Sequence, residues 1–239
     1  MRFLRFVVIL GVILGALFVG ADRWAVSYAE NRLAERIQAR QGLAGSAEVD
    51  IKGFPFLTQA LSHDLQRVDL KLTGVDATAD GRKTRLSQLD ASFHEVKLNG
   101  DYTGGTARRA EGTALINYED LTKASQNGVT LTYGGAPNKV KVTATLDFLG
   151  QSLTRSVVST ITLADAKDGG GGAKTVRVRA DSVPGEGIPG IESAVRKRTD
   201  FDRRIDGGLP DGLQLTALTS DAAGVHLSLS GANVVLAGS

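Results

Sequence analysis

The chain opens with an apolar run, residues 6–21, that contains no charged side chain. Two arginines precede the run and Asp22 follows it, an order that leaves the N-terminus in the cytoplasm and the rest of the chain outside. As a helix, the run rises about 24 Å, somewhat less than the roughly 30 Å hydrocarbon core of a bilayer. The pattern predicts a signal peptide or signal anchor over residues 1–22 and a folded extracytoplasmic body over residues 23–239.

Two interpretations of this segment stay open. The short side chains at 19–21 suit a signal-peptidase cut directly after them, which would release the body into the periplasm-like space. Helical spacing nevertheless continues beyond the run, with Trp24 at an interfacial position and Leu33 and Ile37 on one stripe. An unbroken helix of this kind favours a retained single anchor at the plasma membrane. The basic residues at the start of the chain argue against a third interpretation, a buried core helix.

Beyond residue 47 the apolar positions recur at every second residue instead of at helical spacing. Val49 and Ile51, for example, alternate with charged side chains, which is typical of an antiparallel strand with one buried and one wet face. Turns that contain glycine or asparagine separate the alternating segments. These segments predict strands at residues 47–52, 65–72, 89–98, 111–118, 129–133, 140–148, 153–163, 175–183, 213–219, 225–229 and 233–236.

Two further stretches return to helical spacing, a short one at 119–125 and a longer one at 190–205. Within 89–98 the alternation slips by one residue between Phe93 and Val96, which predicts a β-bulge. The predicted fold class is α+β. We expect a long, curved antiparallel β-sheet wrapped around one or two helices, preceded by an N-terminal membrane helix.

Composition narrows the possible chemistry. A formal net charge of +2 provides no strong basic surface, so a nucleic-acid partner is not expected. The chain has no cysteine, which excludes disulfides, thiolate metal sites and a lipid-modified cysteine. Aromatic residues make up only 5% of the chain, so we expect an interior lined mainly by aliphatic side chains.

Catalytic and cofactor motifs are weak in this sequence. The three histidines, His63, His94 and His226, lie far apart at polar strand positions or beside a turn, and no nucleophile-elbow sequence accompanies them. Residues 185–190 match the G-x-G-x-x-G pattern, but Pro189 removes a backbone donor that a phosphate-binding loop uses. We therefore expect a protein that is not an enzyme and that needs no metal or other cofactor.

Two segments are candidates for contact with lipid. Residues 54–57 place three large apolar side chains in a loop, which either folds onto the core, lines an apolar groove or dips into a membrane. The basic run 196–198 is either a solvated helix face or a contact for lipid phosphates.

A fairly specific motif, Gly-Phe-Pro-Phe-Leu-Thr-Gln, occupies residues 53–59, and weaker patterns accompany it at residues 23–30, 49–52, 67–70, 208–213, 224–227 and 234–236. In these segments the chain resembles the actinobacterial LmeA family of phospholipid-binding envelope proteins. Two departures stand out: Lys52 occupies a position where a glycine is usual in the family, and four glycines are inserted at 169–172. The first of these departures bears on the preference for a lipid headgroup.

The resemblance implies a fold similar to that of tubular lipid-binding proteins, in which a curved sheet and a long helix leave an apolar groove. It also implies binding of phospholipids, including phosphoinositides, and a part in building lipid-linked mannans of the cell envelope, with an envelope glycosyltransferase as partner. We therefore expect non-enzymatic phospholipid binding or transfer at the outer face of the plasma membrane. A structural or adaptor protein of the envelope, without lipid cargo, is the alternative.

An aliphatic groove suits acyl chains, because each buried CH₂ group contributes about 0.8 kcal/mol. We expect the groove to be formed by Leu33, Ile37, Phe54, Phe56, Leu57, Ile191 and Val195. We expect the headgroup to be bound by Lys52, Arg196 and Lys197.

Overall fold

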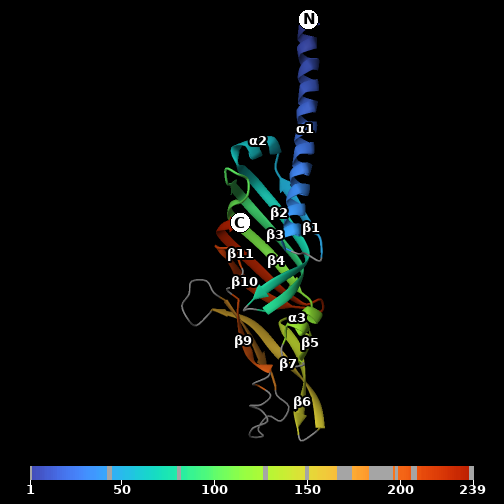
Figure 1. Cartoon of the computed structure of the whole chain (residues 1–239), viewed down its shortest axis with the longest axis vertical. Coiled ribbons are helices and arrows are strands. Elements are labelled where there is room, and N and C mark those ends of the chain that lie inside the picture. The colour runs from blue at the N-terminus through green and yellow to red at the C-terminus, as the bar shows by residue number, and fades with distance from the viewer. Residues whose placement is uncertain are drawn as a thin grey trace.

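The computed structural model describes residues 2–41, 45–79, 82–125, 129–148, 151–165, 174–182, 196, 199–205 and 209–236. Its helices are α1 (Arg2–Gln41), α2 (Phe56–Ser62) and α3 (Tyr118–Ala124). Its strands are β1 (Ala47–Lys52), β2 (Asp64–Ala79), β3 (Arg82–Leu98), β4 (Gly105–Ile116), β5 (Val129–Tyr133), β6 (Lys139–Phe148), β7 (Gln151–Asp165), β8 (Lys174–Ala180), β9 (Phe201–Ile205), β10 (Leu213–Ser220) and β11 (Val225–Leu236). The strands form two antiparallel sheets that follow one another along an elongated molecule (Figure 1).

Helix α1 has an apolar half that stands clear of the body and a second half that lies against β1 (Figure 1). Side chains of the apolar half are open to the surroundings: Val12 is 67% exposed and Leu17 is 64% exposed. The helix is long and apolar enough to cross a membrane, and only 6% of its most apolar window is buried inside the molecule. The interpretation as a buried core helix is therefore wrong, and both an anchor and a signal segment are compatible with the structure.

The larger sheet has six strands in the order β1-β2-β3-β4-β11-β10, so the C-terminal hairpin completes a sheet begun by the first four strands. Its register aligns an apolar row across neighbouring strands, formed by Val49, Leu70, Ala91, Gly112 and Leu229. We call the face that carries this row the inner face and the opposite one the polar face. The alternation of the sequence produces these two faces, because successive side chains of a strand point to opposite sides.

A buried cluster, here called the helix cluster, joins α1 and α2 to the inner face of this sheet. Helix α1 contributes one stripe, on which Val26 is buried and Ile37 is partly buried. Trp24 and Tyr28 lie on other faces of the helix and stay exposed. The buried members of the helix cluster are Val26, Val49, Ile51, Phe56, Leu65, Val68, Val96 and Ala107.

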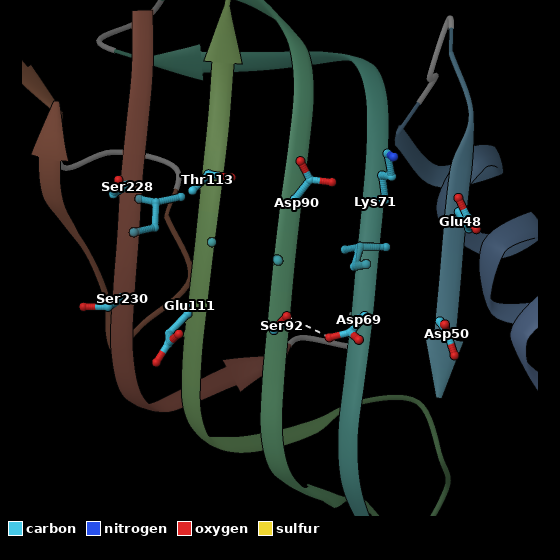
Figure 2. A pocket seen from close by; sticks show the side chains of 14 residues that line it. Glu48, Asp50, Asp69, Lys71, Asp90, Ser92, Glu111, Thr113, Ser228 and Ser230 are labelled. Atoms are coloured by element: carbon cyan, nitrogen blue, oxygen red, sulfur yellow. Dashed lines mark hydrogen bonds between the residues drawn. The ribbon is translucent and has the colours of Figure 1, made fainter. Parts of the chain in front are cut away.

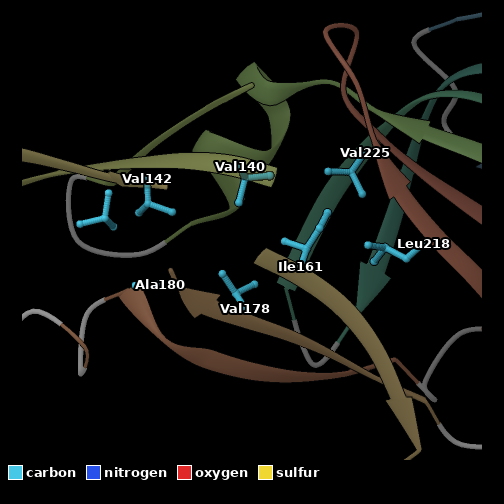
Figure 3. Close-up of a cluster of buried hydrophobic side chains, with 8 residues drawn as sticks. Val140, Val142, Ile161, Val178, Ala180, Leu218 and Val225 are labelled. Atoms are coloured by element: carbon cyan, nitrogen blue, oxygen red, sulfur yellow. The ribbon is translucent and has the colours of Figure 1, made fainter. Parts of the chain in front are cut away.

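The smaller sheet has five strands in the order β5-β6-β7-β8-β9. One of its faces is lined by valine and isoleucine, and Leu218 and Val225 of the larger sheet pack onto that face (Figure 3). Tyr118 of α3 packs against the same cluster. This junction cluster connects the two sheets, and its buried members are Val140, Val142, Val157, Ile161, Val178, Ala180, Leu218 and Val225.

Four neighbouring strands change their alternation at one shared row. At this row, one residue of each strand has no ladder partner, although the pairs on both sides of it keep the same register. The four unpaired residues lie opposite one another and are Gln66, Glu95, Arg108 and Asn233. Glu95 and Asn233 have left-handed backbones, with φ of 51° and 53°. Each strand therefore accommodates one extra residue at the same level, and no strand shifts relative to its neighbours.

The consequence of this row is a change of face within each strand. Leu65 and Val68 both belong to the helix cluster, although ordinary alternation would place them on opposite faces. Phe93 and Val96 pack against the same cluster, which confirms the slip predicted in β3. The slip differs from a bulge in a single strand, because the extra residue recurs in four adjacent strands.

The α+β class, the long antiparallel strands and the apolar N-terminal helix are confirmed, with the strands divided between two sheets. The predicted helix at 190–205 is wrong at its end, where residues 201–205 form β9 and pair with β8. The unpaired edge of β8 provides a partner for this segment, and Asp202 forms ion pairs with Arg177 and Arg179 across the two strands. Of the remainder of that prediction, only residues 196 and 199–200 are described.

Candidate functional site

The junction of α1 and α2 is held by one buried carboxylate. Asp22, the first charged residue after the apolar run, has an exposed fraction of 0%. Its Oδ1 accepts a hydrogen bond of 2.8 Å from the backbone N–H of Leu57 in the first turn of α2. Its Oδ2 accepts a 2.9 Å bond from the guanidinium of Arg23. Because Pro55 at the N-cap of α2 provides no capping side chain, the missing acceptor comes from α1 instead.

The other end of α2 is fixed as well. The left-handed C-cap residue His63 stacks on Tyr102, with ring centroids 4.5 Å apart. The hydroxyl of Tyr102 donates to the carbonyl of Ala60 over 3.1 Å. The buried side chain of Gln59 accepts a 2.8 Å bond from the backbone N–H of Gln66 in β2. Helix α2 is therefore held at both ends and along its inner side.

The structure places two of the groove candidates, Phe56 and Leu57, at this junction, whereas Ile37 packs onto the helix cluster farther along α1. Phe56 is buried in the helix cluster, Ile37 packs against that cluster, and Leu57 is half-buried. Phe54 and Leu33 are exposed, and the guanidinium carbon of Arg23 lies 5.4 Å from the centre of the Phe54 ring. The remaining two groove candidates, Ile191 and Val195, lie outside the described residues.

The headgroup candidates are not brought together. Lys52 lies on β1 and forms an exposed ion pair with Asp50, whose hydrogen bond raises the pKa of Lys52 above its ordinary value. Arg196 lies beside the smaller sheet, where it contacts Asp200 and the carbonyl of Ala180. Lys197 lies outside the described residues.

A hollow of about 710 Å³ spans five strands of the larger sheet (Figure 2). Most of its lining is polar, and by register these polar side chains share the polar face. One lysine, Lys71, lies among five carboxylates, which are those of Glu48, Asp50, Asp69, Asp90 and Glu111. The sequence shows these residues only as the wet half of ordinary strand alternation. Their convergence depends on the register between strands, which a single sequence does not reveal.

The carboxylate of Asp69 illustrates the electrostatics of the hollow. Burial raises the pKa of Asp69, but hydrogen bonds from Arg67 and Ser92, both 2.7 Å, outweigh burial and hold the pKa below its ordinary value. The group therefore stays charged at neutral pH. An excess of negative charge of this kind repels a lipid phosphate. Within the described residues no cluster of side chains is suited to hold a metal ion.

The inner face offers a different surface. Between the helix cluster and the junction cluster, the side chains of Leu70, Leu89, Ala91, Leu227 and Leu229 are only half-buried. Leu70 packs against the helix cluster and Leu227 against the junction cluster, so the apolar surface runs without interruption from one cluster to the other. This stretch is aliphatic, and Ala91 is a small residue at its centre.

A family model for LmeA-like phospholipid-binding proteins matches residues 20–230, which is most of the chain. The chain belongs to the LmeA-like phospholipid-binding family. No curated protein and no solved structure gives a significant match. The matched range begins just before Asp22 and takes in α2, the smaller sheet and all of the larger sheet except the second half of β11.

For an LmeA-like protein, the two surfaces of the larger sheet differ in what they offer to a phospholipid. The inner face is apolar and suits acyl chains, whereas the acidic hollow on the other side is unfavourable for a phosphate. Membership in the LmeA-like family therefore directs attention to the inner face and to its end at the α1–α2 junction. The hollow remains a feature that membership in a phospholipid-binding family does not explain.

Two of the three histidines of this LmeA-like protein make structural contacts. His63 caps α2 and stacks on Tyr102. His226 lies 2.9 Å from a carboxylate oxygen of Asp221, at the turn between β10 and β11. The LmeA-like family is named for phospholipid binding and not for a reaction, which agrees with the expectation of a non-enzymatic protein.

Proposed function

We propose that the protein binds a phospholipid through its acyl chains along the inner face and transfers it at the outer face of the plasma membrane. The observation that carries this proposal is the half-buried aliphatic stretch between the helix cluster and the junction cluster. A chain of 16 carbons buried there gains roughly 10 kcal/mol before losses, which is the scale needed to compete with a bilayer.

The proposed contacts extend from this stretch toward α1. Phe56, Ile37 and Leu57 lie at that end, with Phe54 and Leu33 at its exposed margin. The proposal keeps Ile191 and Val195 as further acyl-chain contacts, and Lys52, Arg196 and Lys197 as headgroup contacts. Because Lys52 and Arg196 lie beside different sheets, a single headgroup engages one of them at a time.

The biological setting is part of the proposal. The cargo is a phospholipid, with phosphoinositides included, and its delivery supports the assembly of lipid-linked glycans of the cell envelope. An envelope glycosyltransferase is the proposed protein partner. The support is the membership in a phospholipid-binding family together with the apolar N-terminal helix.

A retained anchor also belongs to the proposal. Helix α1 continues without a break through the predicted cleavage point. Cleavage would make Asp22 the first residue, although its side chain is fully buried and bonded to α2. The intact mass of the protein isolated from its native membrane tests this point, and a mass that corresponds to a chain starting at Asp22 contradicts it.

The cargo is tested by extracting lipid from the purified full chain and identifying it by mass spectrometry. We expect co-purified phospholipid, and we expect the variant Ala91→Phe to retain several-fold less, because a ring on the inner face occupies the space of an acyl chain. Thr113→Phe is the matched control, since Thr113 belongs to the polar face of the neighbouring strand. Equal lipid in all three proteins, or none in any, contradicts the proposal.

The competing function is a structural or adaptor protein without lipid cargo, and the acidic hollow is the observation that favours it. A basic segment of a partner protein has the charge that this hollow attracts. Capture of a defined envelope protein that is independent of lipid, and that is lost when Asp90 and Glu111 are changed to asparagine and glutamine, supports this alternative. Capture that depends on lipid supports the transfer function.

A further inference from the structure

Three large apolar side chains are exposed at the place where α1 leaves the body. Trp24 of α1 is 71% exposed, Phe54 is 54% exposed, and Leu61 of α2 is 79% exposed. On α2, Thr58 and Leu61 are both exposed and lie three residues apart, so they share one side of the helix, and Phe54 lies just before the helix begins. Single exposed apolar residues are ordinary, but exposed apolar side chains on α2, directly before it and on the adjoining part of α1 form a patch that calls for a partner.

The patch is rigidly tied to the end of the apolar run of α1. Asp22 directly follows that run, and its carboxylate holds the first turn of α2 through Leu57. Tyr102 and His63 hold the last turn. The position of α2 relative to the apolar run is therefore set by the Asp22–Leu57 hydrogen bond and by the packing of both helices on the sheet, and not by a flexible tether.

The length of the apolar run determines the depth at which this patch lies. The run rises about 24 Å, while the hydrocarbon core of a bilayer is roughly 30 Å thick. If α1 spans the membrane, the residues directly after the run lie at the boundary between acyl chains and headgroups. Trp24 then occupies the zone in which interfacial aromatic residues are enriched, and α2 lies beside it.

The side chains around the patch match the chemistry of that zone. Arg23 lies over the Phe54 ring, and Arg32 lies over the Tyr28 ring with 5.6 Å between its guanidinium carbon and the ring centre. Tyr28 in turn stacks on Trp24 at 5.7 Å. Aromatic rings with adjacent guanidinium groups suit a layer of lipid phosphates above acyl chains.

We propose that the exposed side of α2, together with Trp24, docks on the outer surface of the lipid bilayer. The body then stands upright on the membrane, and the α1–α2 end of the inner face lies at the level of the headgroups. The occupant is the bilayer itself, because the patch continues directly from the apolar surface of α1. This inference rests on the proposed membrane location of α1, and it is independent of the lipid cargo.

The experiment uses the full chain with single cysteines, which is direct because the natural chain has none. The variants Leu61→Cys, Leu14→Cys and Val158→Cys each carry an environment-sensitive fluorophore and are reconstituted into vesicles of phosphatidylcholine and phosphatidylglycerol. Position 61 reports on α2 and position 14 on the apolar run. Position 158 is an exposed apolar residue of the smaller sheet and is the matched control.

We expect the probe at 61 to be quenched by brominated acyl chains and to be several-fold less accessible to aqueous iodide than the probe at 158. A probe at 61 that is as accessible as the one at 158, while the probe at 14 is protected, overturns docking and leaves the anchor intact. Exposure at both 14 and 61 overturns the membrane location and docking together. Protection at 61 in native membranes but not in these vesicles overturns the lipid surface in favour of a protein partner.

Discussion

Glu95 of β3 and Arg108 of β4 face each other across the larger sheet, with 2.8 Å between Oε2 and Nη1, at a row where the strands carry no ladder pair. The same row includes Asn233 of β11, which shares the left-handed backbone of Glu95. The row passes through the helix cluster, and the extra residue in each strand lets apolar side chains on both sides of the row, such as Leu65 and Val68, face the same way. The packing of α1 and α2 onto the sheet therefore depends on a row that lies near one end of these four strands.

The first prediction concerns the backbone of that row. Asn233→Val is expected to lower the free energy of unfolding by about 1–2 kcal/mol, because a β-branched residue is strained at positive φ. Asn233→Gly is expected to stay within about 0.5 kcal/mol of the parent, since glycine accepts this conformation. Chemical denaturation measures both, with Ser230→Val at an ordinary ladder position of the same strand as control. Equal effects of valine at 233 and 230 contradict a conformational origin.

The second prediction concerns the contact between α1 and α2. Asp22→Ala removes the acceptor for the Leu57 amide, so the first turn of α2 is expected to exchange its amide hydrogens roughly fivefold to tenfold faster. Asp22→Asn keeps a carbonyl acceptor, so its exchange rates in this turn are expected to lie between those of the parent protein and those of Asp22→Ala. Hydrogen exchange with mass spectrometry over residues 55–63 is the measurement. Arg23→Gln is the control, because it removes only the partly exposed partner of Asp22.

The sequence predicts those features of the structure that depend on the burial of single residues. Alternation reports burial, and burial is a property of single residues, so the strands around Val49 and Val142 were predicted close to their observed bounds. The slip at Phe93–Val96 was visible for the same reason. The extension of this slip over four strands was not predictable, because only the register between strands shows that Asn233 and Gln66 lie in the same row.

The errors and omissions involve pairings between distant segments. The bond from Asp22 to Leu57 joins residues 35 positions apart, and nothing local marks Asp22 as a helix cap. The last residues of the predicted helix at 190–205 are strand because the edge of β8 is available to pair with them. Arginine and aspartate spaced along a helix face look the same in the sequence as Arg179 and Asp202 paired across two strands.

The third prediction concerns acid stability. The pKa of Asp69 is held below its ordinary value of 3.8, because the hydrogen bonds from Arg67 and Ser92 outweigh the effect of burial. A carboxylate with a lowered folded-state pKa stabilises the fold above its unfolded pKa, and this contribution is lost as the pH falls through the folded pKa. The contribution of Asp69 to the free energy of unfolding is therefore expected to be constant with pH near neutrality and to decrease below about pH 4.

The measurement for this prediction is the carboxyl titration of Asp69, followed by carbon NMR. Ser92→Ala removes one of its two donors and is expected to raise the pKa of Asp69 toward its ordinary value, so that Asp69 contributes a smaller loss of stability in acid and this loss ends at a higher pH. Asp69→Asn is expected to remove the part of the acid-dependent loss of unfolding free energy that arises from Asp69. A titration of Asp69 at or above 3.8 in the parent protein is incompatible with the hydrogen bonds described.

The fourth prediction separates the two aromatic residues that flank Pro55. Phe56 is buried in the helix cluster, whereas Phe54 is 54% exposed. Phe56→Ala is expected to lower the free energy of unfolding by about 3–5 kcal/mol, since it leaves a cavity beneath α2. Phe54→Ala is expected to stay within about 0.5 kcal/mol, because little of that ring is removed from solvent.

The same pair distinguishes stability from contact with the membrane. Phe54→Ala leaves the fold intact, and in vesicles it is expected to make a probe at position 61 more accessible to aqueous iodide. Phe56→Leu, which keeps most of the buried volume, is the matched control and is expected to leave that accessibility unchanged. If Phe54→Ala destabilises the body as much as Phe56→Ala does, its ring belongs to the core and not to the exposed patch. If neither Phe54→Ala nor Phe56→Leu alters the probe, docking does not depend on this loop and rests on Trp24 and Leu61.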